Sequence, residues 1–226
     1  NVDTQPDRFF LAAHLAKHQL SPKLKTGAMG LNYGYHFDSA LLGQYLQKLA
    51  IQQGVKHIKS TVLAVQQHIN GDLKSVQLAD GQVVSGELFV DCSGFKALLA
   101  EQTLGVEFIT YKQQLFNDRA VTLPTATANP LSSQTLATAL SHGWAWQIPL
   151  TNRSGNGYVF SSDYCNTEQA EVELRQHLNM LDSPVEAKHL KMKVGRLAQH
   201  WSKNCLAVGL SQGFIEPLEA TALHLV

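Results

Sequence analysis

The chain has 226 residues, of which 44% are hydrophobic and 16% charged, and its 18 Lys and Arg are balanced by 18 Asp and Glu. This length allows a sizeable core, while the zero net charge and the lack of a basic stripe argue against a nucleic-acid partner. No apolar run reaches the ~18–20 residues that a membrane-spanning helix needs, so we expect no membrane partner either.

Residue patterns for several common sites are missing from the sequence. The ten histidines never stand at HxH or HExxH spacing, so we predict no metal site. GxSxG, GxxxxGK[ST] and GxGxxG motifs are absent. The cysteines at positions 92, 165 and 205 form neither a CxxC pair nor a disulfide framework, which favours reduced thiols in a cytoplasmic protein.

Two helices are predicted in the first part of the chain. Residues 8–20 carry apolar residues near helical spacing, and residues 21–34 are predicted to form a loop. A longer helix begins after Asp38, a favourable N-cap, because apolar residues follow at i, i+3, i+4 and i+7. Gly54 ends this helix as the C′ residue, and residues 55–58 are extended.

An antiparallel meander and a buried strand come next. The meander has two turns of the Asn-Gly or Asp-Gly type, at 70–71 and 80–81, between strands over residues 62–69, 74–78 and 83–84. The apolar strand 88–90 then leads into Asp91-Cys92-Ser93-Gly94. Small residues at a strand end let the backbone approach a cofactor, although an ordinary strand-to-helix turn is the alternative.

The second half of the chain predicts another sheet and a return to the first. Its predicted elements are strands over residues 118–123, 144–150 and 158–162, a turn over 152–157, a helix capped by Thr167, and strands over 190–196 and 206–210. We interpret this order as an α/β, Rossmann-type dinucleotide-binding fold with an antiparallel β-meander and an inserted second β-sheet layer.

Two segments carry candidate chemistry. The first is the predicted strand Gly143-Trp144-Ala145-Trp146-Gln147-Ile148-Pro149. Its two indoles stand at i and i+2, so they share one face of the strand. They serve either as part of the core or as the lining of a site. In the segment 209–223 a strand ends and a helix starts near Glu219. A helix N-terminus offers unpaired N–H groups to an anion, but Glu216 and Glu219 would also serve simply to complement the dipole.

Together these residues resemble the flavin-dependent tryptophan halogenase family. The family signature Gly-Trp-x-Trp-x-Ile-Pro stands at residues 143–149 and separates the family from other flavin monooxygenases. Supporting matches keep the family's order over nearly the whole chain, at residues 35–38, 88–95, 157–162, 194–196, 204–205 and 214–221. The resemblance makes the fold a glutathione-reductase-like FAD-binding fold.

The resemblance implies an enzyme that halogenates an aromatic, tryptophan- or indole-type substrate. A separate flavin reductase, as a transient partner, supplies reduced FAD. Oxygen and a bound chloride or bromide then give hypohalous acid, which passes through an internal tunnel to the small aromatic substrate. A homodimer is compatible with this reading.

The resemblance also implies roles for individual residues. The chemistry of the residue types is consistent with several of these roles. Glu219 matches a catalytic glutamate, which orients the halogenating species and takes the ring proton. Flavin contacts fall on Val62, near the adenine end, and on Leu210 and Leu223. The halide is held by the N–H groups of Thr221 and Ala222. Trp144 and Trp146 line the tunnel, so we expect them inside the protein near the loop that carries Thr221.

The chain departs from the family at two positions, since Ala220 and Ala222 stand where the family usually has Ser and Gly. A Gly with positive φ could not be replaced by Ala222 without strain, which puts the halide pocket in doubt. We read residues 1–226 as an internal part of one halogenase domain, with the catalytic lysine and the Gly-rich phosphate loop expected upstream. Residues 1–116 and 203–226 are assigned mainly to the FAD-binding layer, and 117–202 mainly to the second sheet and substrate layer.

Two other functions fit the same fold. A flavin-dependent aromatic monooxygenase would hydroxylate its substrate, but it must let the substrate reach the flavin, which paired indoles would prevent. A flavoprotein-like scaffold without halogenating activity is the reading that Ala220 and Ala222 motivate.

Overall fold

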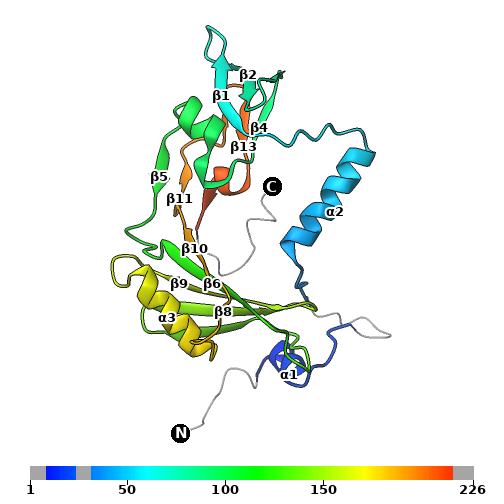
Figure 1. Cartoon of the computed structure of the whole chain (residues 1–226), viewed down its shortest axis with the longest axis vertical. Helices are drawn as coiled ribbons and strands as arrows, with labels where there is room; N and C mark the ends of the chain where they lie inside the picture. The colour runs from blue at the N-terminus through cyan, green and yellow to red at the C-terminus, as the bar shows by residue number, and fades with distance from the viewer. Residues whose placement is uncertain (1–8, 24–31, 216–226) are drawn as a thin grey trace.

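The computed structural model describes residues 9–23 and 32–215, with four sheets and three α-helices in those ranges (Figure 1). The α-helices are α1 (Leu11–Lys17), α2 (Ser39–Gln52) and α3 (Thr167–His177). Short helical turns are η2 (Gly94–Lys96), the π-helix η3 (Leu98–Thr103) and η4 (Gly209–Ser211). The mixture of helices and several sheets confirms the α/β character predicted from the sequence.

A five-stranded antiparallel sheet forms the lower part of the molecule in Figure 1, with strand order β10-β6-β9-β8-β7. Its strands are β6 (Arg119–Thr125), β7 (Leu136–Leu140), β8 (Gly143–Pro149), β9 (Ser154–Phe160) and β10 (Lys188–Lys191). Helix α3 covers one face, where Ala170 and Leu174 pack against Val121, Tyr158 and Phe160. The buried core on this face fixes the register, because a one-residue slip would turn these side chains to the other face.

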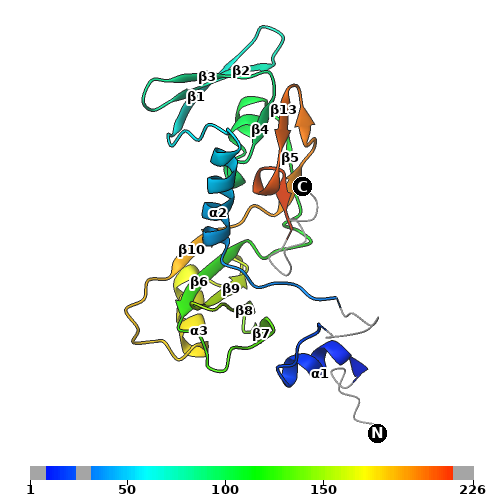
Figure 2. The same cartoon turned by 90° about the vertical axis from the view of Figure 1, so that its right-hand side faces the viewer.

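Three smaller sheets form the upper part in Figure 1, and Figure 2 shows the meander at its far end. The meander comprises β1 (Val62–Gln67), β2 (Leu73–Leu78) and β3 (Val83–Ser85). In the second sheet β4 (Phe89–Asp91) is parallel to β13 (Cys205–Ala207), which pairs with β12 (Trp201–Ser202). The third has β11 (Gly195–Leu197) between β5 (Phe108–Thr110) and β14 (Gly213–Phe214).

Helix α2 forms as its local sequence predicts. Asp38 is the N-cap, and its Oδ1 accepts hydrogen bonds from the N–H groups of Ala40 at 2.9 Å and Leu41 at 3.2 Å. At the other end Gly54 has φ +92°, and the N–H of Val55 donates to the Ala50 carbonyl, which makes a Schellman C-cap. Both predicted helix signals are confirmed. Asp38 also accepts a hydrogen bond from Arg153, which ties the start of α2 to the lower sheet.

Several predicted boundaries are wrong, and strand pairing explains the first of them. Residues 154–157 of the predicted turn belong to β9, since they pair with both β6 and β8. Strand β7 was not predicted at all. Helix α3 is capped by Asn166 rather than Thr167, because Asn166 and Gln169 form a reciprocal capping box.

Two predicted long strands are each interrupted. The predicted strand 190–196 divides into β10 and β11, because the chain leaves one sheet for another there and buries Met192 and Val194 between them. The predicted strand 206–210 stops at Ala207, and η4 follows with Gly209 at φ +62°. The first helix covers 11–17 rather than 8–20.

Tyr158 provides a test of the lower core. Its buried hydroxyl donates to Glu173 at 2.8 Å and accepts the His142 N–H at 3.0 Å, and burial followed by the Glu173 contact raises the Tyr158 pKa. We predict that Tyr158→Phe lowers the free energy of unfolding by about 1–3 kcal/mol, because it leaves the His142 N–H unsatisfied. Urea unfolding measures this. The control Tyr164→Phe, at a side chain 69% exposed, should change it by less than ~0.5 kcal/mol; equal losses would contradict the assignment.

Candidate functional site

The site is built where two parallel strands end side by side. Ala207 at the end of β13 is in register with Asp91 at the end of β4. The loop after β4 runs into η2, and the loop after β13 forms η4. In open sheets with parallel strands, ligands bind in the crevice beyond the carboxyl ends of the strands. The pairing therefore brings the candidate segment 91–94 close to the start of the candidate segment 209–223.

Asp91 holds these loops in place. Its side chain is 1% exposed, and Oδ1 accepts hydrogen bonds from the N–H and hydroxyl of Ser93 and from the hydroxyl of Ser211. Its Oδ2 accepts the N–H groups of Leu99 at 2.8 Å and Ala100 at 2.9 Å. Burial opposes ionisation, but these donors outweigh it and hold the Asp91 pKa below its usual value. One carboxylate thus joins β4, the π-helix η3 and η4.

The backbone beside Asp91 is open to a ligand. Gly94 has φ +72° and Gly209 φ +62°, and a Cβ added at either position would have no atom of the described residues within 4 Å. Leu210 lies between Gly209 and Ser211 and is 44% exposed. Bare main chain at the ends of parallel strands fits the close approach of a flavin nucleotide, so the residues present are compatible with FAD.

Trp144 and Trp146 lie on the face of the five-stranded sheet opposite α3. Their ring centroids are 5.9 Å apart, with the planes tilted by 56°. Both indoles pack against the buried cluster of Ala120, Val159, Met192 and Val194. Phe95, which follows β4, and Phe214 of β14 pack against the same cluster. The prediction that the indoles share one face of the strand is confirmed, and both residues are half-buried. Through this cluster the indoles are linked to the turn after β4, which contributes Phe95.

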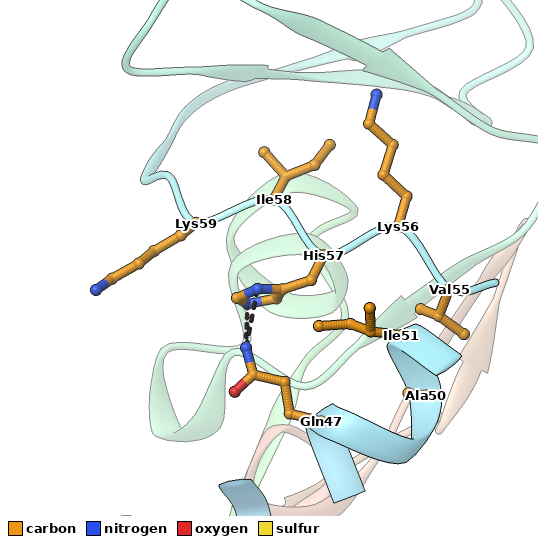
Figure 3. Close-up of a pocket in the computed structure, with 8 residues that line it drawn as sticks. All are labelled: Gln47, Ala50, Ile51, Val55, Lys56, His57, Ile58 and Lys59. Carbon is orange, nitrogen blue, oxygen red and sulfur yellow. Dashed lines mark hydrogen bonds between the residues drawn. The ribbon is translucent and has the colours of Figure 1, made fainter. Parts of the chain in front are cut away.

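The structure places Val62, another predicted site residue, away from the strand that carries the indoles (Figure 1). Val62 begins β1, at the end of the molecule away from β8 in both views (Figures 1 and 2). An open pocket of about 620 Å³ lies near it, at the end of α2, lined by Gln47, Ala50, Ile51, Val55 and residues 56–59. Figure 3 shows the Gln47 amide against the His57 ring, and neither Trp nor Leu210 lines this pocket.

Four predicted site residues, Glu219, Thr221, Ala222 and Leu223, lie outside the described residues. Ala220 and Glu216 do so as well. Within residues 9–23 and 32–215, no three His, Cys, Asp or Glu side chains are placed to hold a metal ion. In the same ranges no helix is long and apolar enough to cross a membrane.

Asp91, Ser211 and Phe214 lie in candidate segments of the sequence, but the sequence analysis predicted no role for any of these three side chains. A local signal existed for Asp91, because an Asp two residues before Ser93 forms an Asx-turn through the Ser93 N–H. Its bonds to Leu99 and Ala100, and the Ser211 bond from a distant part of the chain, had no such signal.

Comparisons with known proteins identify relatives over most of the chain. The family model described as "Tryptophan halogenase" matches residues 7–226. Tryptophan 6-halogenase SttH from Streptomyces toxytricini is 43% identical over 86% of this chain, and tryptophan 7-halogenase RebH from Lentzea aerocolonigenes is 36% identical over 91%. The matches cover only 38% and 40% of those two proteins.

Solved structures agree with the sequence matches. The crystal structure of SttH superposes with a TM-score of 0.90 and 40% identity, over 98% of this chain and 47% of that one. BrvH, a flavin-dependent halogenase from Brevundimonas sp. BAL3, superposes with a TM-score of 0.87 and 36% identity, over 99% of this chain and 47% of that one. The chain therefore spans less than half the length of these relatives.

The role of Asp91 predicts a pH-dependent stability. Its pKa is lowered by folding, so its contribution is present above the unfolded value near ~4 and is lost as the pH falls through the folded value. We predict that Asp91→Asn lowers the free energy of unfolding by roughly 2–3 kcal/mol at neutral pH, and that this difference shrinks on acidification.

Urea unfolding at several pH values measures both effects. Asp80→Asn is the matched control, since Asp80 is an exposed carboxylate that also accepts an N–H two residues on, from Gln82. A loss with Asp80→Asn as large as that with Asp91→Asn, or a loss at Asp91 that does not vary with pH, would contradict the assigned role.

Proposed function

The chain belongs to the tryptophan halogenase family, and we propose that the complete protein halogenates tryptophan or a related indole-type substrate with reduced FAD, O2 and chloride or bromide. The observation that carries this proposal is that Trp144 and Trp146 lie side by side and share a buried hydrophobic cluster with Phe95, in the turn after β4. Relatives named tryptophan 6-halogenase and tryptophan 7-halogenase support the reaction and the substrate class.

The proposed fold is a glutathione-reductase-like FAD-binding fold. Residues 1–116 and 203–226 would contribute mainly to the FAD-binding layer, and residues 117–202 mainly to the substrate layer. The parallel pair β4–β13 supports the first assignment, and the separate five-stranded sheet supports the second.

The main chain at Gly94 and Gly209 would hold FAD, together with Leu210, Leu223 and, near the adenine end, Val62. The open space beside both glycines supports this placement. When bound, FAD supplies from O2 the oxidising power that turns a halide into an electrophile. A separate flavin reductase would deliver the reduced cofactor as a transient partner.

The proposed task of Trp144 and Trp146 is to separate cofactor from substrate. Two adjacent indoles on this face of the sheet would block a bulky aromatic substrate, whereas a small hypohalous acid would pass through the proposed tunnel beside them. Thr221 and Ala222 would hold the halide through their N–H groups. Glu219 would orient the halogenating species and accept the proton that the ring carbon releases.

The direct test is an assay of the complete gene product with a flavin reductase, NADH, O2 and chloride or bromide, using tryptophan and other indoles as substrates. Mass spectrometry of the products is the readout. A product heavier by one halogen in place of hydrogen supports the proposal. A hydroxylated product alone would instead identify a monooxygenase, and failure to bind FAD would identify a scaffold without this activity.

The separating role of the indoles makes a further prediction. We expect Trp146→Phe to lower the halogenation rate on the order of tenfold, about 1.4 kcal/mol, with FAD affinity unchanged, because the smaller ring leaves a gap in the wall. Trp201→Phe is the control, since that indole is 59% exposed and lies in β12. Equal rates in the parent and Trp146→Phe, or equal losses in both variants, would refute the role.

A further inference from the structure

The indole of Trp146 rests on a glycine of the neighbouring strand. Gly157 of β9 is in register with Trp146 of β8. A Cβ added at Gly157 would fall under 3.0 Å from Cζ2, Cη2 and Cε2 of Trp146, all atoms of the six-membered part of the indole. The ring therefore occupies the place where every other residue type would put its side chain.

The two tryptophans have similar neighbours on β7 but different neighbours on β9. On the β7 side both face alanine, Trp146 being paired with Ala137 and Trp144 with Ala139. On the β9 side Trp144 is paired with Val159, whereas Trp146 is paired with Gly157. Only Trp146 can lean fully over its β9 partner. The tilt of 56° and the centroid separation of 5.9 Å between the indoles follow from that position.

Another glycine of the same strand provides the contrast. Gly155 lies two residues earlier and so faces the same side of the sheet. A Cβ at Gly155 would meet Arg153 Nη1 at 3.2 Å and the Ile148 carbonyl oxygen at 3.9 Å. The nearer of these atoms is the end of a flexible side chain, which can move aside. A methyl group is therefore tolerated at Gly155 and excluded at Gly157.

We propose that Gly157 is a positioning residue for the indole pair: its missing side chain seats the Trp146 ring and so sets the geometry of the wall formed with Trp144. Its consequence for catalysis rests on the proposed halogenase function, whereas the seating itself does not. A methyl group at position 157 moves the Trp146 ring off β9, which changes the distance and the angle between the indoles.

The experiment compares Gly157→Ala with Gly155→Ala in the complete protein, and its first readout is optical. Two indoles at this separation couple, so far-ultraviolet circular dichroism reports their geometry, and Trp146→Phe defines the signal of the lost pair. We expect Gly157→Ala to lose most of that signal and Gly155→Ala to keep it. An unchanged signal in Gly157→Ala, or an equal change in Gly155→Ala, overturns the proposal.

A double-mutant cycle is the second readout. Phe lacks the outer atoms of the indole that a Cβ at Gly157 would meet. Gly157→Ala should therefore lower the midpoint of thermal unfolding by roughly 2–4 °C in the parent, but by less than half as much in a Trp146→Phe background. Equal shifts in both backgrounds would refute the seating. If Gly157→Ala alone does not fold, recovery of folding in the double variant supports the proposal and failure to recover overturns it.

Activity is the third readout. Gly157→Ala should lower halogenation as far as Trp146→Phe does, with FAD affinity unchanged, while Gly155→Ala keeps the parent rate. If the parent protein does not halogenate, the proposed function fails and the dichroism and the cycle still decide the role of Gly157. If those two readouts fail while the parent halogenates, only the positioning role is lost.

Discussion

Trp144 and Trp146 pack against a buried cluster formed by Ala120 and Val159 of the five-stranded sheet together with Met192 and Val194. Phe95 and Phe214 pack against the same cluster, at the segment where the chain crosses from β10 to β11. Apolar burial at this junction keeps the sheet that carries the indoles against the loops that would hold FAD. The sequence left core packing and site lining as alternatives for these tryptophans, and the structure shows both indoles packed against a buried cluster.

The loop side of this junction depends on a buried carboxylate without a cationic partner among the hydrogen bonds that surround it. Asp91 is satisfied by backbone N–H groups and the hydroxyls of Ser93 and Ser211. Neutral donors fixed by the fold stabilise the charge and leave little freedom to the loops. Gly94 and Gly209 are half-buried, and among the described residues the space where their Cβ atoms would lie stays open.

The sheet side depends on small residues placed beside large ones. Ala137, Ala139 and Gly157 flank the indoles on the adjacent strands, and on the opposite face Ala145 is surrounded by Tyr158 and Phe160. Cores reach their density by such alternation, since two large side chains cannot share one position. The same family motif that supplies two tryptophans therefore requires neighbours from strands that lie elsewhere in the sequence.

The sequence by itself determined what short-range rules govern. Asp38 and Gly54 delimit α2 through bonds within a few residues, the Asn-Gly and Asp-Gly turns delimit the meander, and the two-residue strand period places both indoles on one face. The motif at 143–149 also carried the family resemblance. Only the tertiary structure decided that β4 pairs with β13, that the strand predicted at 190–196 divides between two sheets, and that Gly157 lies under Trp146. Those outcomes depend on contacts between different strands, most of them far apart in the chain. The energies of such contacts cannot be read from a local pattern of side chains.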